Sequence, residues 1–115
     1  MTEPTIFTRI LDGDVPGEIL ASTDRLFAIR DIAPQAPVHI LVIPKTAEYR
    51  DVTELAAGDP GLLAELVAFA QRIADEHADG HFRLVFNTGE NAGQTVPHVH
   101  GHVLAGGLSE KSVGA

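Results

Sequence analysis

A histidine recurs at every second position between Pro97 and Leu104, in the sequence PHVHGHVL. Side chains on a β-strand alternate between its two faces, so a strand here would place His98, His100 and His102 on one face. Same-face residues on a strand lie about 6.6 Å apart, which lets both outer rings reach a group held at the middle ring. Imidazoles titrate near neutral pH, and a cluster of them is typical of a chemical site. The stretch therefore predicts a strand that carries a functional site.

The composition narrows the class of protein. The chain has 115 residues, enough for one domain with a modest core. It has no cysteine, which excludes disulfides, thiolate metal sites and a cysteine nucleophile. The formal net charge of −8, with the cations scattered, argues against a nucleic-acid-binding surface, and no apolar run is long enough to cross a membrane. We expect a single cytoplasmic domain over residues 1–115, with a loose tail from about residue 105.

The rest of the sequence alternates between strand and helix patterns. Val38–Pro44 is nearly continuous in β-branched residues, which predicts a central strand covered on both faces. Asp59 and Pro60 are favourable at a helix N-terminus, and an apolar stripe over 61–77 predicts the main helix. Shorter elements are expected as helices at 5–11 and 51–57 and as strands at 18–22, 25–31, 82–87 and 96–104.

Polar residues at three other places can contribute to the histidine site. The loop over 87–95 contains glycines, which let a backbone approach an anion closely. Its Asn87 and Thr95 offer an amide and a hydroxyl to phosphate or ribose oxygens. His39 lies in the apolar 38–44 strand, where a single histidine is more often a core residue than a functional one. Asp31 ends a strand and can either bind a ribose diol or cap a loop.

Together these segments resemble the histidine-triad family, whose signature is three histidines that alternate with apolar residues. The likeness covers most of the chain and includes Thr5–Phe7, Asp31–His39, Leu41–Lys45 and Asn87–His102. The sequence is most similar to the nucleotide-binding hydrolase branch, the purine-nucleoside phosphoramidases. The resemblance implies an α+β fold with a five-stranded antiparallel sheet, one long helix and one or two short ones. It also implies a homodimer in which the sheet continues into the partner.

The resemblance further implies a role for each site residue. His100 would attack the α-phosphate of a purine nucleoside phosphoramidate and form a nucleotidyl-histidine intermediate, which water then hydrolyses. His98 and His102 would hold the phosphate oxygens, and His39 would support His98. No metal or cofactor is required, because imidazoles and amides stabilise the charge. The substrate-binding positions would be Asp31 for the ribose, Asn87 and Thr95 around the phosphate and leaving group with Gly93 and Gln94 beside them, and Ile6, Phe7, Ile10, Ile29, Ile32 and Leu41 for the base.

Four departures from the family pattern bear on specificity. Gly101 stands where the dinucleoside polyphosphate hydrolases of the family typically carry a glutamine, which disfavours that activity. Pro97 and Gly101 replace larger side chains, and the glycine suggests close packing against another backbone. Arg30 adds a cation that could pair with Asp31. Residues 109–115 contain no aromatic side chain, whereas this branch often ends in an aromatic tail that crosses near the partner's site.

Two rival functions use the same residues. A metal-dependent hydrolase would take the three alternating histidines as ligands, with His39 or Asp31 nearby. A nucleotide-binding module with little activity would keep the pocket without the turnover.

The prediction of a dimer also has a separate basis in the main helix. The helix carries more large apolar side chains than one small core is expected to bury, namely Leu62, Leu63, Leu66 and Phe69. We expect part of that stripe, with the 82–87 strand, to bury against a second copy.

Overall fold

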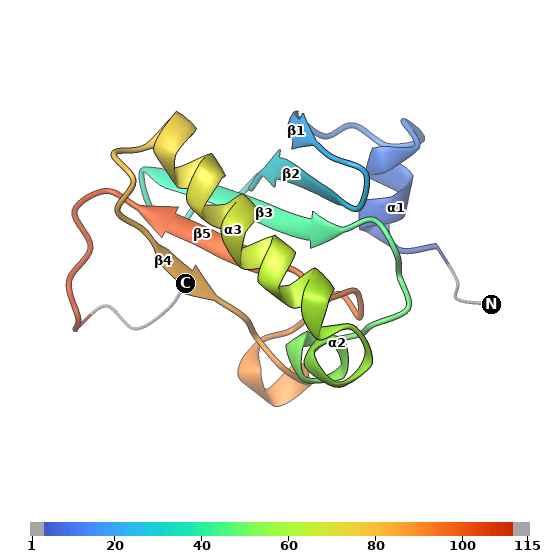
Figure 1. Ribbon diagram of the computed structural model, residues 1–115. Helices are drawn as coiled ribbons and strands as arrows, with labels where there is room; N and C mark the ends of the chain where they lie inside the picture. Colours follow the sequence, from blue (N-terminus) through green and yellow to red (C-terminus); the bar gives the residue numbers. More distant parts are fainter. Residues whose placement is uncertain (1–3, 112–115) are drawn as a thin grey trace.

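The computed structural model describes residues 4–111. Its five strands form one antiparallel sheet in the order β1-β2-β3-β5-β4 (Figure 1). The predicted α+β fold with a five-stranded antiparallel sheet is confirmed. The elements in chain order are α1 (Ile6–Leu11), β1 (Ile19–Ser22), β2 (Leu26–Arg30), β3 (Val38–Pro44), α2 (Val52–Gly58), α3 (Pro60–His77), β4 (Arg83–Val85), the 3-10 turn η1 (Glu90–Ala92) and β5 (Gly101–Ala105).

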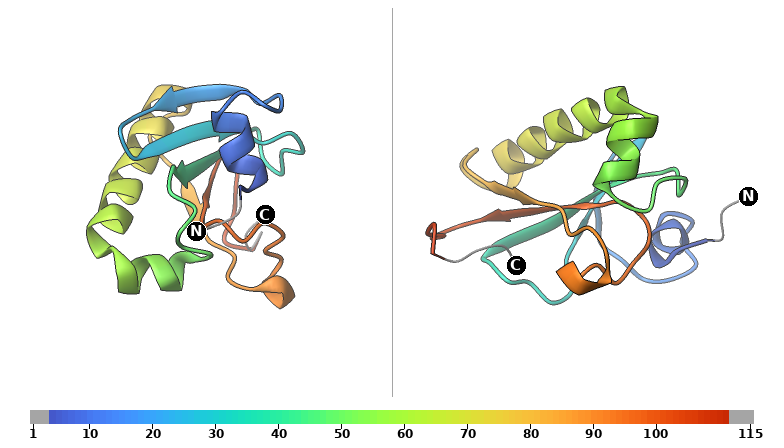
Figure 2. Two further views of the ribbon diagram at one scale, coloured as in Figure 1. Left: turned by 90° about the vertical axis from the view of Figure 1, so that its right-hand side faces the viewer. Right: turned by 90° about the horizontal axis from the view of Figure 1, so that it is seen from below.

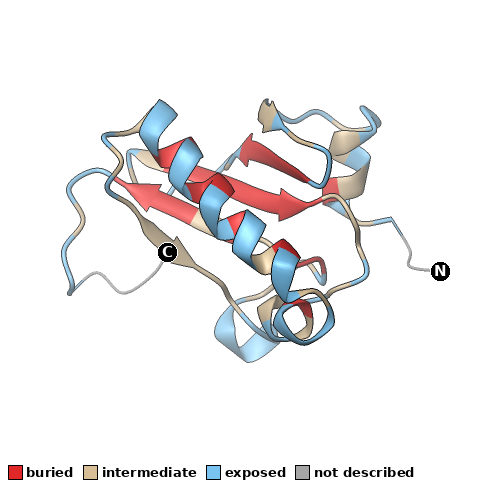
Figure 3. Cartoon of the chain, viewed as in Figure 1, coloured by how far each residue is buried: buried red, intermediate tan, exposed pale blue. Residues whose placement is uncertain are grey.

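The helices lie on opposite faces of the sheet. α3 covers one face, and α1 and η1 lie on the other (Figure 2). The central strand β3 supplies both faces, because its side chains alternate: Ile40 and Val42 pack in the cluster beneath α3, whereas Leu41 and Ile43 pack beneath α1. β3 is buried from His39 onward, as its apolar sequence predicts, and β2 and β5 beside it are also largely buried (Figure 3).

The helix α3 begins where its sequence predicts. The Asp59 carboxylate accepts a hydrogen bond from the Leu62 amide at 3.0 Å, and Pro60 occupies the first turn. The expectation that its apolar stripe exceeds the core is wrong for most of the residues concerned. Leu62, Leu66 and Phe69 are at most 5% exposed within a single chain, because β2, β3 and β5 together offer a wide apolar face. Only Val67, at 45% exposure, stands out as a large apolar residue on the solvent side of this helix.

The strand predicted over 96–104 is shorter, because β5 begins only at Gly101. The preceding segment bends, and Pro97 within it has no amide to donate to a ladder. Its backbone is held by other bonds: the His98 amide donates to the Val96 carbonyl and the Val99 amide to the Tyr49 carbonyl, both at 2.9 Å. The three histidines therefore do not share one strand face, and each has to be placed separately.

Gly101 packs against side chains rather than against a backbone. A Cβ added there would come within 2.9 Å of Leu84 Cδ1 and 3.2 Å of the Phe86 ring, so the absence of a side chain permits close contact between β5 and β4. The edge strand β4 is also shorter than the predicted 82–87.

The first part of the region expected to form a loose tail contacts the rest of the chain. Ala105 belongs to β5 and is 3% exposed, and the Arg83 guanidinium donates to the Ser109 carbonyl at 2.7 Å. The last part of the predicted loose tail, residues 112–115, lies outside the described residues. None of the helices within residues 4–111 has the length and apolar character needed to span a membrane.

Candidate active site

His98 is the most deeply buried of the alternating histidines, at 0% exposure. Its Nε2 lies 2.7 Å from the Pro44 carbonyl at the end of β3, and its Nδ1 lies 2.6 Å from the Thr5 hydroxyl. Burial lowers the pKa of His98, so the ring is neutral at pH 7. Both ring nitrogens are occupied within the protein, and the expectation that His98 holds phosphate oxygens is not met in this structure.

His100 presents one nitrogen to the protein and keeps the other free. Its Nδ1 lies 2.8 Å from the His98 carbonyl, which can only accept, so Nδ1 carries the proton. Burial also lowers the pKa of His100, opposed by that hydrogen bond and by the charge of Asp31. In the neutral ring the lone pair then resides on Nε2, which forms no hydrogen bond with any residue of the described chain. His100 thus has the protonation state that a nucleophile requires.

His102 is hydrogen-bonded to His39, and not to His98 or His100. The Gln35 amide donates to His39 Nδ1 at 3.0 Å, which leaves the proton of the neutral ring on Nε2. That Nε2 lies 2.9 Å from His102 Nδ1 and donates to it, so His102 carries its own proton on Nε2. The prediction that His39 supports His98 is therefore wrong, since its partner is His102.

The register of the sheet explains this pairing. In the β3–β5 ladder His39 lies opposite Leu104 and Leu41 lies opposite His102. His39 and His102 are diagonal neighbours on one face, a separation that long side chains bridge. Burial, together with its two imidazole neighbours, lowers the pKa of His102 to about 4. Burial lowers the pKa of His39 as well, against the opposing charge of Asp31. At neutral pH the site is therefore lined by uncharged imidazoles.

Asp31 joins the same group from the end of β2. One carboxylate oxygen accepts from the Ala33 amide at 2.7 Å, and the other lies 3.4 Å from His39 Nε2. The side chain is 18% exposed, so it can cap the loop and still meet a ligand. Arg30 turns away and pairs with Glu18 at 3.4 Å, not with Asp31.

The loop expected to surround a phosphate is held by bonds within it and by a bond to the Arg50 carbonyl. Gly93 has a φ of 93°, a conformation that other residues rarely adopt, and it ends η1. Gln94 is committed to the protein: its amide nitrogen donates to the Arg50 and Val96 carbonyls, and its oxygen accepts from the Gly89 amide. Asn87 is half-buried and Thr95 is exposed, so both have side-chain surface available to a ligand.

The apolar residues expected to wall the base divide into two groups. Phe7, Ile29 and Leu41 are 4–7% exposed and form the core beneath α1, with Ile10 packed against it. Phe7 also meets the rings of His98 and His100 edge to face, with centroids 5.5 and 4.8 Å apart. In contrast, Ile6 and Ile32 are 45% and 98% exposed, so they offer open apolar surface.

One group of residues could hold a metal ion, and it differs from the expected set. One ligand atom from each of Asp31, His39 and His102 lies within 4.8 Å of the others; we call these residues the Asp31 cluster. His98 cannot join them while both its nitrogens are bonded elsewhere. The donor set suits a divalent cation, but within the described residues these atoms already face one another through hydrogen bonds and an ion-pair contact.

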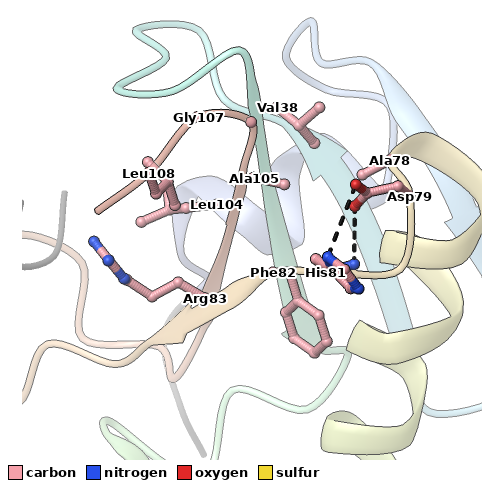
Figure 4. Close-up of a pocket in the computed structure, with 11 residues that line it drawn as sticks. Val38, Ala78, Asp79, His81, Phe82, Arg83, Leu104, Ala105, Gly107 and Leu108 are labelled. Atoms are coloured by element: carbon pink, nitrogen blue, oxygen red, sulfur yellow. Dashed lines mark hydrogen bonds and ion pairs between the residues drawn. The ribbon is translucent and has the colours of Figure 1, made fainter. Parts of the chain in front are cut away.

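A further cavity in the described chain is lined by none of these imidazoles. It has a volume of about 600 Å³ and lies between the segment that links α3 to β4, β4 itself, the end of β5 and the segment that follows β5 (Figure 4). Its acid–base pair, Asp79 and His81, is 76% and 93% exposed at its side chains, with 3.9 Å between the nearest atoms. Exposed groups of this kind retain ordinary solvation, and the cavity lacks the buried polar groups of the histidine site.

Sequence reasoning missed three groups that bond to the histidines. They are the Thr5 hydroxyl, the Gln35 amide and the Pro44 carbonyl. The two backbone groups leave no trace in a sequence. Thr5 could have been noticed as a helix N-cap, because threonine is favoured there, but nothing in the sequence links it to a histidine 93 residues away.

Comparisons with known proteins agree with this geometry. The chain matches the family model of the HIT domain over residues 12–107. It is 38% identical over 108 residues to the purine nucleoside phosphoramidase of Escherichia coli, covering 92% of this chain and 90% of that protein. It is 44% identical over 107 residues to an uncharacterized HIT-like protein of Synechococcus elongatus, covering 92% and 93% of the two chains.

Solved structures show the same likeness. A HIT family hydrolase from Clostridium thermocellum superposes with a TM-score of 0.84 at 36% identity, covering 92% of this chain and 93% of that one. A histidine triad protein from Clostridium difficile gives a TM-score of 0.84 at 32% identity, covering 95% and 96%. With the alternating histidines, the five-stranded sheet and a family match over most of its length, the chain belongs to the HIT domain family.

Proposed function

We propose that this protein is a purine nucleoside phosphoramidase, which hydrolyses the phosphorus–nitrogen bond of nucleoside 5′-phosphoramidates through a nucleotidyl intermediate on His100. The observation that carries the proposal is the state of the His100 ring. Its Nδ1 proton is held by the His98 carbonyl at 2.8 Å, so the Nε2 lone pair is directed away from that bond. The named activity of the Escherichia coli relative supports the choice of substrate class.

In the first step His100 Nε2 attacks the α-phosphorus. The nitrogen–phosphorus bond forms while the bond to the leaving amine breaks, and the amine takes the bonding pair and a proton from water, which leaves a hydroxide ion to be neutralised by the proton released in the second step. The ring becomes a cation, which the His98 carbonyl stabilises through Nδ1–H. Water then attacks the phosphorus, the lone pair returns to Nε2, and a nucleoside monophosphate and a proton are released.

His102 supplies a neutral donor beside the reacting atoms. Its ring centroid is 5.1 Å from that of His100, and its Nε2–H is oriented by the bond from His39 to Nδ1. A pKa of about 4 keeps this ring neutral at pH 7. It therefore acts as a hydrogen-bond donor to a phosphoryl oxygen and not as a second cation.

Asp31 is the proposed ribose contact, and the exposed Ile6 and Ile32 are the proposed base contacts. A charged hydrogen bond from a diol to a carboxylate contributes about 1.5–3 kcal/mol. Asp31→Ala should therefore weaken the binding of AMP by that amount and leave 2′,3′-dideoxy-AMP nearly unchanged in titration calorimetry. Equal losses for both ligands would make Asp31 a loop cap only.

We also propose a homodimer that continues the sheet across β4. β4 is the last strand in the sheet order and is half-buried along its length. Val67 on α3, the helix that covers the sheet, is exposed. Phe82→Glu, beside β4, should convert a dimer to monomers in sedimentation at micromolar concentration. Phe69, which is 5% exposed, is a core residue and is unsuitable for this test. A wild-type chain that sediments as an active monomer would contradict the dimer.

The activity itself is tested with adenosine 5′-phosphoramidate, ATP and diadenosine polyphosphates in parallel, with AMP release followed by chromatography. We expect the phosphoramidate to be the preferred substrate. His100→Ala should lower turnover at least about 10²-fold while AMP binding persists. His81→Ala is the matched control, because it removes the same side chain from an exposed position and should leave turnover unchanged. Preference for the dinucleotides, or activity of His100→Ala near that of the control, would refute the proposal.

A further inference from the structure

We propose that the Thr5 hydroxyl is a positioning group for His100, acting through His98. The proposal rests on the hydrolase function above and adds a residue from the opposite end of the chain. Thr5 is the N-cap of α1, where its hydroxyl accepts from the Thr8 amide at 3.3 Å. The same oxygen lies 2.6 Å from His98 Nδ1. A single hydroxyl thus joins the first helix to the histidine segment.

The direction of these bonds follows from the groups involved. The Pro44 carbonyl can only accept, so the neutral His98 ring carries its proton on Nε2. His98 Nδ1 must then accept, and the Thr5 hydroxyl donates to it. The hydroxyl therefore receives one bond from the helix and gives one to the ring. Both nitrogens of His98 are satisfied only while this donor is present.

The main chain of His98 lies outside the sheet. The β3–β5 ladder reaches only Gly101, so no ladder bond holds the His98 carbonyl. The anchors of the His98 ring therefore act together with the two backbone bonds of this segment, from the His98 amide to Val96 and from the Val99 amide to Tyr49. That carbonyl accepts the Nδ1 proton of His100 and so decides which nitrogen of His100 is free. If the His98 ring loses its Nδ1 partner, the ring and its carbonyl gain freedom, and the orientation of the nucleophile becomes less well defined.

A second contact connects α1 to the same place. Phe7, in the first turn of α1, meets the rings of both His98 and His100. The Thr5 hydroxyl and the Phe7 ring therefore both contact the histidine segment from α1. Thr5 itself bonds to His98 and not to His100, so its effect on the reaction is indirect.

The test compares three variants of the capping box that Thr5 and Thr8 form. Thr5→Val removes the hydroxyl, and with it the bond to His98 and the cap bond from the Thr8 amide, and Thr5→Ser restores both. Thr8→Val is the matched control, because it removes the bond from the Thr5 amide to the Thr8 hydroxyl but keeps the bond to His98. We expect kcat for adenosine 5′-phosphoramidate to fall about 10- to 100-fold in Thr5→Val with little change in KM, and to recover in Thr5→Ser. Thr8→Val should keep a kcat close to that of the wild type.

A spectroscopic measurement decides the inference independently of turnover. In nitrogen-15 NMR of the imidazoles, Thr5→Val should shift the His98 Nδ1 resonance and make the His100 Nδ1 proton exchange with water about tenfold faster, as loss of one hydrogen bond predicts. If Thr5→Val does not fold, Thr5→Asp takes its place, because a carboxylate caps the helix but has no proton to donate.

The outcomes separate the two proposals. A wild-type protein with no phosphoramidate turnover refutes the proposed function, while the NMR measurement still tests the link from Thr5 to His100. Unchanged His98 and His100 resonances in Thr5→Val overturn the inference. An equal fall of kcat in Thr5→Val and Thr8→Val also overturns the inference. It would show that the capping of α1, and not the bond from Thr5 to His98, lowers turnover.

Discussion

Replacement of His98 by leucine tests whether this residue holds the fold or the phosphate. The substitution roughly keeps the volume and removes two hydrogen bonds, to the Pro44 carbonyl and to the Thr5 hydroxyl. Each buried group left without a partner costs about 1–3 kcal/mol, or about 2–6 kcal/mol for the two. Burial of a more apolar side chain returns about 1–2 kcal/mol. We therefore expect a net destabilisation within about 0–5 kcal/mol and centred at about 2–3 kcal/mol, a large share of the roughly 5–15 kcal/mol typical of such domains.

The assay is urea unfolding followed by far-UV circular dichroism, with the midpoint and the slope fitted separately. His81→Leu is the control, because that side chain is 93% exposed and should change stability by less than about 0.5 kcal/mol. A phosphate-binding His98 predicts the opposite pattern, with little change in unfolding and a large loss of AMP affinity. A destabilisation of His98→Leu no greater than that of the control would refute the structural role.

Three further predictions concern pH, packing and metal. The pKa of His102 is lowered from 6.5 to about 4, so between these values the unfolded chain binds a proton that the folded chain does not. The free energy of unfolding measured in urea titrations should therefore be greatest above pH 6.5 and fall as the pH drops toward 4. Gly101→Val should destabilise the protein by about 1–3 kcal/mol in the same assay, because its Cβ would lie 2.9 Å from Leu84 Cδ1. Turnover should survive EDTA, since the Asp31 cluster is already bonded internally; loss with EDTA and recovery with zinc would support the metal-dependent rival.

The pH dependence of turnover should follow the titration of His100. Burial lowers the pKa of His100, and only the neutral ring has a free lone pair. The acid limb of kcat/KM should therefore lie below pH 6.5, the ordinary value for histidine. An acid limb above that value would contradict a nucleophile whose pKa is lowered.

The sequence by itself determined the elements whose signals are local. The continuous apolar run of β3 and the Asp59 cap with the stripe of α3 lie where the patterns predict. The alternation of histidines indicated a candidate site, and in the structure Asp31 and His39 lie together with His102. In each case the relevant information is side-chain type at a fixed spacing, which a single segment carries.

Only the tertiary structure decided which groups bond to each histidine. His39 meets His102 because the β3–β5 register sets Leu41 opposite His102, and a register is a property of two strands that no single strand encodes. His98 became a buried anchor because Pro97 and the bend before Gly101 keep it out of the ladder. Its partners are a backbone carbonyl and a hydroxyl 93 residues away. Such contacts arise from long-range packing, and the free Nε2 of His100 follows from them rather than from the alternating pattern.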